Sequence, residues 1–383
     1  MKKNSPLFEH FNLVSDPRMD RTKRYKLIDI LIITICGVLS DCDCWTDIVD
    51  WGEENEKWLE KYLGIENGIP SHDTFGRVFS ILKPDELHRA FYSWVNELKG
   101  NKKVREIINI DGKFLNGTKS FDDSRNALII VSAWAVESGI TLAQLSSRLK
   151  KDEGEKKTTE KILDCIEVKG NIITLDAMGA TPNILNKIVD KGGDHVVSIK
   201  NNQRKIKTFI DKFMNMNQDL IELKTVFDDG HGRKEERRYE FIQLSNERTL
   251  GLNQLKNGCF GRFKKISGLG KVTSTRKKNG IESSQTRYFM STLGEIDEFA
   301  TAIRSHWSIE NNLHWQMDVT FREDEQKAKL GYVAENLAGI RRFALGLINQ
   351  ETTEKKSKRR KRRLCLMRKS YLLKVILGDQ LSI

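Results

Sequence analysis

The sequence predicts an α/β protein in which a mixed sheet is flanked by helices, with a helical region before it and a β-rich insertion within it. Three patterns support this fold class. Residues 22–99 carry apolar side chains at helical spacing, and from residue 104 onward short apolar runs alternate with helical segments. Residues 221–292 instead alternate between apolar and polar side chains, as strands with one solvent-facing side do.

The N-terminal region, which we expect to fold as a domain of residues 1–99, contains four predicted helices. Two run over 26–40 and 45–63, and two more open at Ser71, whose hydroxyl can cap free N–H groups, and at Pro84. In a basic chain, such short helices are typical of a DNA-end-binding module of helix-turn-helix type. A helical bundle that serves only packing or dimerisation fits the same pattern, so both interpretations stay open.

The central region, residues 100–220, predicts the first part of a sheet domain. Apolar runs of strand length lie at 104–110, 127–136, 172–175 and 195–199, and helical segments lie at 162–168 and 182–189. The stretch from 171 to 200 is a compact β-α-β unit, for which we expect a right-handed crossover. The helical residues 293–350 are expected to complete this domain.

Between these two parts, residues 221–292 form the predicted β-rich insertion, in which Asn279-Gly280 is a favourable hairpin turn. After residue 350 we expect a basic C-terminal tail over residues 351–383. Its cluster K-K-S-K-R-R-K-R-R at 355–363 is either a solvated tail or a patch that contacts phosphates. The basic character of the rest of the chain favours the phosphate contact.

The charge balance points to a polyanionic partner. The 383 residues carry a formal charge of +12 with a pI near 9.3, which favours a nucleic-acid surface over a membrane one. No apolar segment follows Lys2 and Lys3 to make a secretory signal, and the apolar stretch 27–39 is too short to cross a bilayer. The six cysteines show neither a C-x-x-C pair nor a zinc spacing, so we expect reduced thiols in a cytoplasmic protein.

Three acidic residues stand in settings that favour metal binding. Asp111 ends the apolar run I-I-N-I-D, Asp176 ends N-I-I-T-L-D, and Glu310 lies in the helical pattern H-W-S-I-E-N-N-L-H-W. Hard divalent ions prefer carboxylate oxygens, and two such ions roughly 3.5–4 Å apart activate a nucleophile and stabilise a leaving oxygen at a phosphodiester. The set therefore predicts metal-dependent phosphodiester chemistry, although an aspartate at a strand end also forms turns and caps.

The helical setting of Glu310 supports this prediction. At 100° per residue, Glu310 shares a face with apolar side chains from Ile303 to Met317, so we expect a carboxylate on a buried face. Such a group needs a metal or another partner, and an ion pair with Arg304 or Arg341 is the simpler alternative.

A rival interpretation uses the same helix. His306, Glu310 and His314 follow one another at four-residue spacing, which is able to hold zinc or iron. It is the weaker interpretation, because this spacing is not a recognised hydrolase motif and because it leaves Asp111 and Asp176 without a role.

At these residues the chain resembles a known family. I-D-G-K at 110–113, L-D-A at 175–177, H-W-S-I-E-N-N-L-H-W at 306–315 and D-V-T-F-R-E-D at 318–324 are similar to motifs of insertion-sequence DDE transposases of the H-repeat-associated branch. G-I-P-S-H-D-T-F-G-R-V-F at 68–79 resembles the transposase-associated domain of that branch, and V-S-I-K-N-N-Q at 197–203 and H-G-R-K-E-E-R-R at 231–238 also match. The motifs cover most of the chain and are specific as a set.

The resemblance implies a ribonuclease-H-like catalytic core in which Asp111, Asp176 and Glu310 form the DDE triad and bind two Mg²⁺ ions, with Mn²⁺ able to substitute. It implies a DNA transposase that cleaves at the terminal inverted repeats of an insertion sequence and then transfers the strand. Its partners are expected to be double-stranded DNA at element ends and target, bound by a homodimer, with no membrane. The expected location is the bacterial cytoplasm, on the nucleoid when bound to DNA.

Seven residues are expected to position DNA, namely Lys113, Lys200, Asn202, Gln203, His231, Arg233 and His306. The wider group has a tyrosine, an arginine and a lysine around the glutamate, where this chain has Ile303, His306 and Met317, so the roles of the missing residues do not transfer. Two alternatives remain open. One is a metal-dependent DNA nuclease or resolvase that cuts without joining, and the other is an inactive relic that only binds DNA.

Overall fold

A computed structural model describes residues 6–99, 105–118, 128–147, 151–230, 233–244, 258–278 and 281–378. The chain divides into two compact units, each made of separate segments. Unit 1 comprises residues 1–104, 112–154 and 310–383, and unit 2 comprises residues 105–111 and 155–309. These units combine segments that the sequence separates, and the predicted domain boundaries remain predictions.

Unit 1 is mainly helical. Its longer helices are α1 (Pro6–Phe11), α2 (Leu27–Leu39), α3 (Trp45–Glu54), α4 (Glu56–Leu63), α5 (His72–Ile81), α6 (Pro84–Lys99), α12 (Val333–Gln350), α13 (Lys358–Met367) and α14 (Lys369–Leu377). Its strands are β2 (Ile129–Ala135) and β3 (Ile140–Ser147), and its short helical turns are η1 (Asp20–Thr22), η2 (Asn116–Thr118) and η8 (Glu323–Glu325).

The N-terminal helices follow the predicted pattern with two differences. The helix expected over 45–63 is two helices, because Asn55 leaves helical backbone geometry and its amide donates to the Trp51 carbonyl at 2.6 Å. Ser71 precedes α5 as predicted, but its hydroxyl contacts Thr74 Oγ1 at 3.2 Å and caps no backbone N–H. Helices α2 and α6 confirm the predicted segments.

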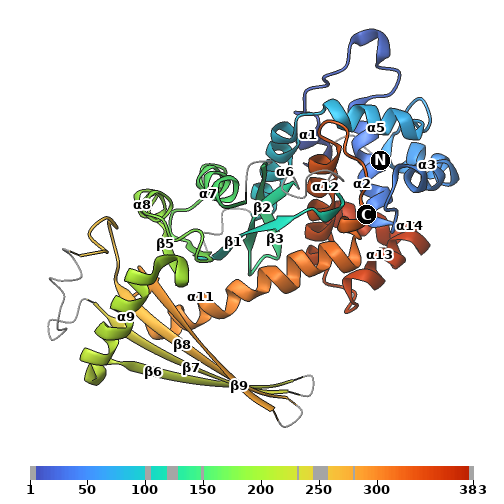
Figure 1. Cartoon of the computed structure of the whole chain (residues 1–383). Helices are drawn as coiled ribbons and strands as arrows, with labels where there is room; N and C mark the ends of the chain where they lie inside the picture. The colour runs from blue at the N-terminus through green and yellow to red at the C-terminus, as the bar shows by residue number, and fades with distance from the viewer. Residues whose placement is uncertain are drawn as a thin grey trace. The chain divides into compact units, whose positions relative to one another are not determined.

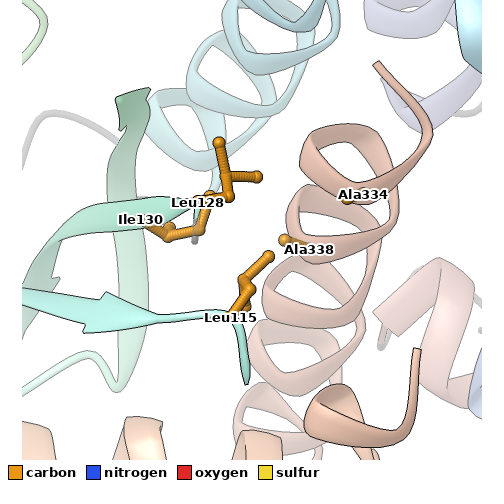
Figure 2. Close-up of a cluster of buried hydrophobic side chains, with 5 residues drawn as sticks. All are labelled: Leu115, Leu128, Ile130, Ala334 and Ala338. Atoms are coloured by element: carbon orange, nitrogen blue, oxygen red, sulfur yellow. The ribbon is translucent and has the colours of Figure 1, made fainter. Parts of the chain in front are cut away.

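Helix α12 is the centre of unit 1, and nearly all of its side chains are buried. On one side, the Phe343 ring stacks on Phe91 of α6 with 4.5 Å between ring centroids. On another side, α12 contributes to a small apolar cluster, which consists of Leu115, Leu128, Ile130, Ala334 and Ala338 (Figure 2). The small side chains of the two alanines leave room for the other three residues, so this contact packs the start of β2 against α12.

The basic C-terminal region is folded over residues 358–377, so most of the cluster at 355–363 belongs to a helix, and its contact with phosphates stays a prediction. These residues form α13 and α14, both of which pack against α12. Arg362 is fully buried, donates to the carbonyls of Val38 and Thr320, and pairs with Asp41 at 3.0 Å. Part of the basic cluster therefore stabilises unit 1, because its charge is satisfied inside the protein.

Unit 2 is built on a sheet. Its strands are β4 (Ile172–Leu175), β5 (Asp194–Ile199), β6 (Glu222–Gly230), β7 (Arg233–Gln243), β8 (Gly268–Lys278) and β9 (Ile281–Ser291), together with the first part of β1 (Ile107–Phe114). The strand order is β3-β2-β1-β4-β5-β9-β8-β7-β6, with β1, β4 and β5 parallel and β9 antiparallel to β5. The sheet is mixed and helices accompany it, so the predicted α/β fold class is confirmed.

The β-rich insertion extends the sheet of unit 2. Strands β6 to β9 form long antiparallel hairpins (Figure 1), and β9 joins them to β5 through pairs such as Val196↔Ser291. Lys278 pairs with Ile281 across the predicted Asn279-Gly280 turn, whose two residues lie outside the described part of the chain. The alternating pattern therefore marks strands of one continuous sheet.

The helices of unit 2 are α8 (Pro182–Asp190), α9 (Arg204–Met216) and α11 (Ile296–Ile309), the short turns η4 (Asn201–Gln203) and η5 (Gln218–Leu220), and most of α7 (Lys151–Ile162). Helix α8 confirms its prediction. The helix expected over 162–168 lies earlier, as α7, because that charged stretch is rich in the good helix formers lysine and glutamate. Strand β3 was not predicted.

Helices α9 and α11 cover opposite faces of the extended sheet. Tyr288 of β9 donates to Asp211 of α9 at 2.7 Å, while its neighbour Phe289 meets Phe299 of α11 edge-on. Successive side chains of a strand point to opposite faces, so the two helices lie on different sides. Among the described residues, no helix combines the length and apolar character needed to cross a membrane.

Candidate active site

Asp111 and Asp176 occupy equivalent positions on neighbouring parallel strands. The last pair between β1 and β4 joins Ile110 to Leu175, and each aspartate is the next residue on its strand. Both side chains are half-buried. Residues at equal register on adjacent parallel strands, which lie about 4.8 Å apart, point to the same face. The sequence placed Asp111 at the end of its strand, which is wrong, because β1 continues to Phe114 and only its pairing with β4 ends there.

A neutral hydrogen-bond network lies one rung below the aspartates. Asn109 of β1 pairs with Thr174 of β4, and each stands two residues before an aspartate, on the same face. Thr174 Oγ1 donates to Asn109 Oδ1 at 2.6 Å and contacts Nδ1 of His306, in α11, at 2.8 Å. Asn109 Nδ2 donates to the Ser305 carbonyl at 2.6 Å. The network therefore joins β1, β4 and α11 next to the two carboxylates.

This network fixes the tautomer of His306. Asn109 Nδ2 faces a carbonyl, so Asn109 Oδ1 faces Thr174 and accepts its only hydroxyl proton. The Thr174 oxygen must then accept from His306, whose Nδ1 carries the hydrogen. Burial lowers the pKa of His306 to about 4, against a smaller opposite effect of the Asp176 carboxylate. The ring is therefore neutral near pH 7, and its Nε2 is a hydrogen-bond acceptor.

Sequence reasoning missed Asn109 and Thr174. Both are polar residues inside apolar strands, and each precedes a candidate aspartate by the two-residue period that keeps side chains on one face. That pattern was a usable signal. The contact with His306 was not readable from sequence, because it joins residues far apart in the chain.

The motif V-S-I-K-N-N-Q at 197–203 holds the loop that follows Asp176. Three of its side chains bond to that loop, namely Lys200 Nζ to Asp176 Oδ2 at 3.4 Å, Asn202 Nδ2 to the Ala177 carbonyl at 3.1 Å, and Gln203 Nε2 to the Ala180 carbonyl. We expected these three side chains to position DNA. In unit 2 they position the aspartate loop, and a contact with DNA stays a prediction.

At Glu310 the helix changes type. Helix α11 ends at Ile309, and the chain continues into unit 1 as the π-helical segments η6 (Glu310–His314) and η7 (Gln316–Thr320). A π-helix has more residues per turn, so the 100° spacing fails there. Ile309, Leu313 and Met317 are buried, whereas Glu310 is exposed. The prediction of a carboxylate on a buried face is therefore wrong, and the even spacing that the zinc interpretation needs is also broken.

Lys113 is held by carboxylates of unit 1. Its ammonium lies 2.6 Å from Asp318, 3.3 Å from Glu323 and 3.2 Å from Asp324. Glu323, fully buried, also pairs with Arg342 of α12 at 2.5 Å. Burial alone would lower the pKa of Lys113, but the three carboxylates raise it overall, so the ammonium stays charged. These ion pairs give Lys113 a structural role, and its expected contact with DNA stays a prediction.

Two of the expected DNA contacts are His231 and Arg233. His231 lies outside the described residues. Arg233 is the first residue of β7, and its backbone pairs with Gly230 and Lys278. Their contact with DNA remains a prediction.

The aspartate pair has the donor chemistry that a hard divalent ion prefers. Mg²⁺ binds carboxylate oxygens and usually keeps waters and substrate phosphate as its other ligands. Asp176 already accepts from the Met178 N–H at 2.7 Å, and its contact with the exposed Lys200 is long at 3.4 Å. Within the described part of the chain, no three His, Cys, Asp or Glu side chains are grouped as ligands of one ion. The carboxylate oxygens of the pair are of the kind that suits such an ion.

Two sequence families match the chain. Residues 8–95 match the family described as DDE_Tnp_1-associated, and residues 102–347 match the family described as Transposase DDE domain. Because the second match spans more than half of the chain, the protein belongs to the transposase DDE domain family, and it is an enzyme of the transposase class.

Individual relatives confirm the H-repeat-associated resemblance. The H repeat-associated putative transposase YhhI of Escherichia coli K12 is 33% identical over 98% of this chain and 99% of its own length. The putative transposase YncI of Escherichia coli O157:H7 is 32% identical over 97% of this chain and 94% of its own length. Among solved structures, a piggyBac transposase synaptic complex with hairpin DNA aligns with a TM-score of 0.43 and 12% identity, over 98% of this chain and 78% of that chain.

Proposed function

We propose that the protein cleaves DNA at the terminal inverted repeats of an insertion sequence and transfers the freed strand to target DNA. The observation that supports this most is the shared register of Asp111 and Asp176 at the point where β1 and β4 stop pairing. Two carboxylates on one face of a parallel strand pair, in a chain of the transposase family, suit an acidic site for phosphodiester chemistry.

Glu310 is proposed as the third acidic residue. His306, four residues earlier, is bonded to Thr174, which itself stands two residues before Asp176. His306 and Glu310 are about one helical turn apart, and Thr174 and Asp176 are successive residues on one face of the chain at β4. Glu310 directly follows Ile309, the last residue of α11, and this helix is bonded to Thr174 through His306.

The proposed roles follow from the chemistry of the side chains. Mg²⁺, with Mn²⁺ able to substitute, would be held as two ions by Asp111, Asp176 and Glu310 and would supply charge stabilisation to the phosphodiester. Asp111 and Asp176 orient their oxygens from a fixed strand register. His306, neutral and donating through Nδ1, keeps α11 on β4 while Nε2 is able to accept a hydrogen bond. Lys200 neutralises part of the acidic charge before substrate binds.

The proposed partners are double-stranded DNA at the element ends and at the target. Joining two ends requires both to be held together, so a homodimer on DNA is part of the proposal. The net charge of +12 favours such a polyanion. The bacterial cytoplasm, with the protein on the nucleoid when bound to DNA, is the proposed location.

The test replaces each acidic residue by its amide, as Asp111→Asn, Asp176→Asn and Glu310→Gln. Cleavage of a duplex that carries the terminal repeat should fall by roughly 10³-fold or more in each variant, since an amide keeps the shape but not the charge. Binding of the same duplex should be retained. Exposed Asp219→Asn, in η5 of unit 2, is the matched control and should cleave normally. Near-normal cleavage by any one of the three variants removes that residue from the site.

A strand-transfer assay with a precleaved end separates the proposal from a nuclease. Joined product that requires Asp111 and Asp176 supports a transposase, whereas cleavage of intact ends without joined product supports a nuclease that only cuts. Binding with neither reaction supports an inactive relic, and the relative YbfQ of Escherichia coli K12, 46% identical over 19% of this chain, carries the name inactive transposase.

A further inference from the structure

Unit 2 contains a cationic pocket that the proposed chemistry does not use. It lies between β7, β8, β9 and α11. Its polar lining consists mainly of Glu235, Arg237, Arg276, Arg287, Arg304 and Trp307. The strand residues of the pocket lie on the sheet face that α11 covers. Along each strand, they are an even number of residues away from an apolar residue of the pocket, such as Tyr239 on β7 or Phe289 on β9, and such residues point to the same face.

The charges in and around this pocket do not cancel. The buried carboxylate of Glu235 binds Arg237 at 2.6 Å and Arg276 at 3.1 Å. Asp228 lies 3.6 Å from Arg237 and 3.4 Å from Arg304. Arg237, Arg276 and Arg304 are thus set against these two carboxylates, which leaves a surplus of positive charge. The carboxylates orient the arginines, and the surplus favours an anionic occupant.

Trp307 organises two of these arginines. The Arg287 guanidinium carbon lies 4.6 Å from the ring centroid of Trp307, and that of Arg276 lies 5.6 Å from it. Stacking on an aromatic face fixes the plane of a guanidinium group. Arg276 Nε donates to Glu235 at 3.1 Å and Arg287 Nη2 donates to Gln285 at 3.0 Å, so one donor of each group is already used. A guanidinium group has five N–H donors in a planar fork that matches two oxygens of a phosphate.

The pocket also lies beside the candidate active site. Trp307 follows His306, the residue bonded to Thr174, and stands three residues before Glu310. Arg287 is close enough to His306 to help lower its pKa. An anion in the pocket is therefore within about one helical turn of the α11 residue that anchors the site.

We propose that this arginine pocket binds a backbone phosphodiester of the DNA strand, next to the one that is cleaved. The inference rests on the proposed function for the identity of the DNA. In this proposal, Arg304 and Arg276 bind the phosphate, and the buried carboxylate of Glu235 orients the guanidinium group of Arg276. Arg287, which stacks on Trp307, is a further phosphate-binding residue.

The first experiment measures binding of a 30-bp duplex of random sequence as a function of salt. Each phosphate contact contributes about 0.9 to the slope of log K against log salt. Arg304→Gln should reduce that slope by about one and weaken binding several-fold at low salt. The matched control is Arg238→Gln, which removes the same charge from the opposite face of β7, where the Arg238 side chain is 53% exposed. The control should lose clearly less of the slope.

A second measurement locates the contact on the unmodified protein. An arginine-selective dicarbonyl reagent, followed by mass spectrometry, should modify Arg304 and Arg276 in the free chain. The duplex should protect both, whereas inorganic phosphate at the same phosphate concentration should not. Equal protection by inorganic phosphate, or none by DNA, overturns the inference of a DNA backbone site.

The two proposals fail in different ways. If Arg304→Gln and Arg276→Gln keep the normal salt slope while Asp111→Asn abolishes cleavage, the pocket inference is wrong and the proposed chemistry stands. If the arginine variants lose the slope while Asp111→Asn cleaves normally, the pocket binds DNA and the acidic site is wrong. Arg304→Lys separates charge from geometry, since a lysine keeps the charge and loses the fork. It should recover most of the slope but less of the affinity.

Discussion

The two units hold their acidic residues by different physical means. In unit 2, the strands that carry Asp111 and Asp176 are tied to α11 by neutral hydrogen bonds through Thr174. In unit 1, the segment after Glu310 is held by the buried ion pair of Glu323 with Arg342. A neutral hydrogen bond contributes about 1 kcal/mol, whereas removing one partner of a buried ion pair costs about 3–5 kcal/mol. A few buried charges therefore contribute much of the stability of unit 1, whereas directional hydrogen bonds position the candidate site in unit 2.

The largest effect should come from Glu323→Gln. The amide leaves Arg342 buried without a full counter-charge, and it removes one of the carboxylates around Lys113. The free energy of unfolding should fall by about 3–5 kcal/mol in a urea titration. Glu325→Gln, the same change at an exposed position of the same η8 turn, should shift it by less than about 0.5 kcal/mol. Equal stability of the two variants would mean that the buried charges do not stabilise unit 1.

As the pH falls, buried histidines should lose stability before the ion pair of unit 1 does. Burial lowers the pKa of His195, on β5 of unit 2, to about 4, and neither ring nitrogen has a partner among the described residues. Between the ordinary histidine value of 6.5 and about 4, the unfolded chain binds the extra proton, so stability falls as the pH falls. Between pH 6.5 and 5, this one residue should cost about 2 kcal/mol.

The ion pair of unit 1 responds at lower pH. Burial alone would raise the pKa of Glu323, but Arg342 and Lys113 lower it to about 2. Its contribution is therefore complete above the ordinary value of 4.5 and is lost only as the pH falls from there through about 2. Urea titrations at pH 7, 6 and 5 check both statements. His195→Leu should reduce the loss above pH 5, while His88 and His306, whose pKa burial also lowers to about 4, should keep the rest of it. Parallel curves for this variant and the unaltered chain would contradict the assignment to His195.

The smallest change in stability is expected for substitutions of His306. These substitutions test the hydrogen bond between His306 and Thr174 directly. Asparagine carries its amide nitrogen at the same position along the side chain as Nδ1, so His306→Asn keeps a donor for Thr174. Glutamine places its amide near Nε2 and loses that bond. Both variants should stay within about 1 kcal/mol of the unaltered stability. End cleavage should remain within a few-fold for asparagine and fall by roughly tenfold for glutamine.

DNA binding distinguishes this outcome from a general structural defect. If His306 acts by positioning α11, the dissociation constant for the duplex should be the same in both variants while the cleavage rate differs. Cleavage by His306→Gln that equals or exceeds that of His306→Asn would show that Nε2, rather than Nδ1, carries the important contact.

The sequence by itself determined many of the local elements and the candidate aspartates. The apolar run 172–175 is the whole of β4, and the described residues of the alternating segment 221–292 include four antiparallel strands. Asp111 and Asp176 were recognisable because each follows an apolar run. These features depend on periodicity along the chain, which is a local property that a single sequence contains.

Only the tertiary structure decided which side chains work together. The pairing of Asn109 with Thr174 and His306 depends on strand register and on how α11 packs against β4, which no local pattern specifies. The basic residues divide in the same way, since Lys113 is buried among carboxylates while Arg304 lines an open pocket. Both residues are cations in a basic chain. Their roles differ because the tertiary structure brings a different set of acidic groups, from distant segments, to each charge.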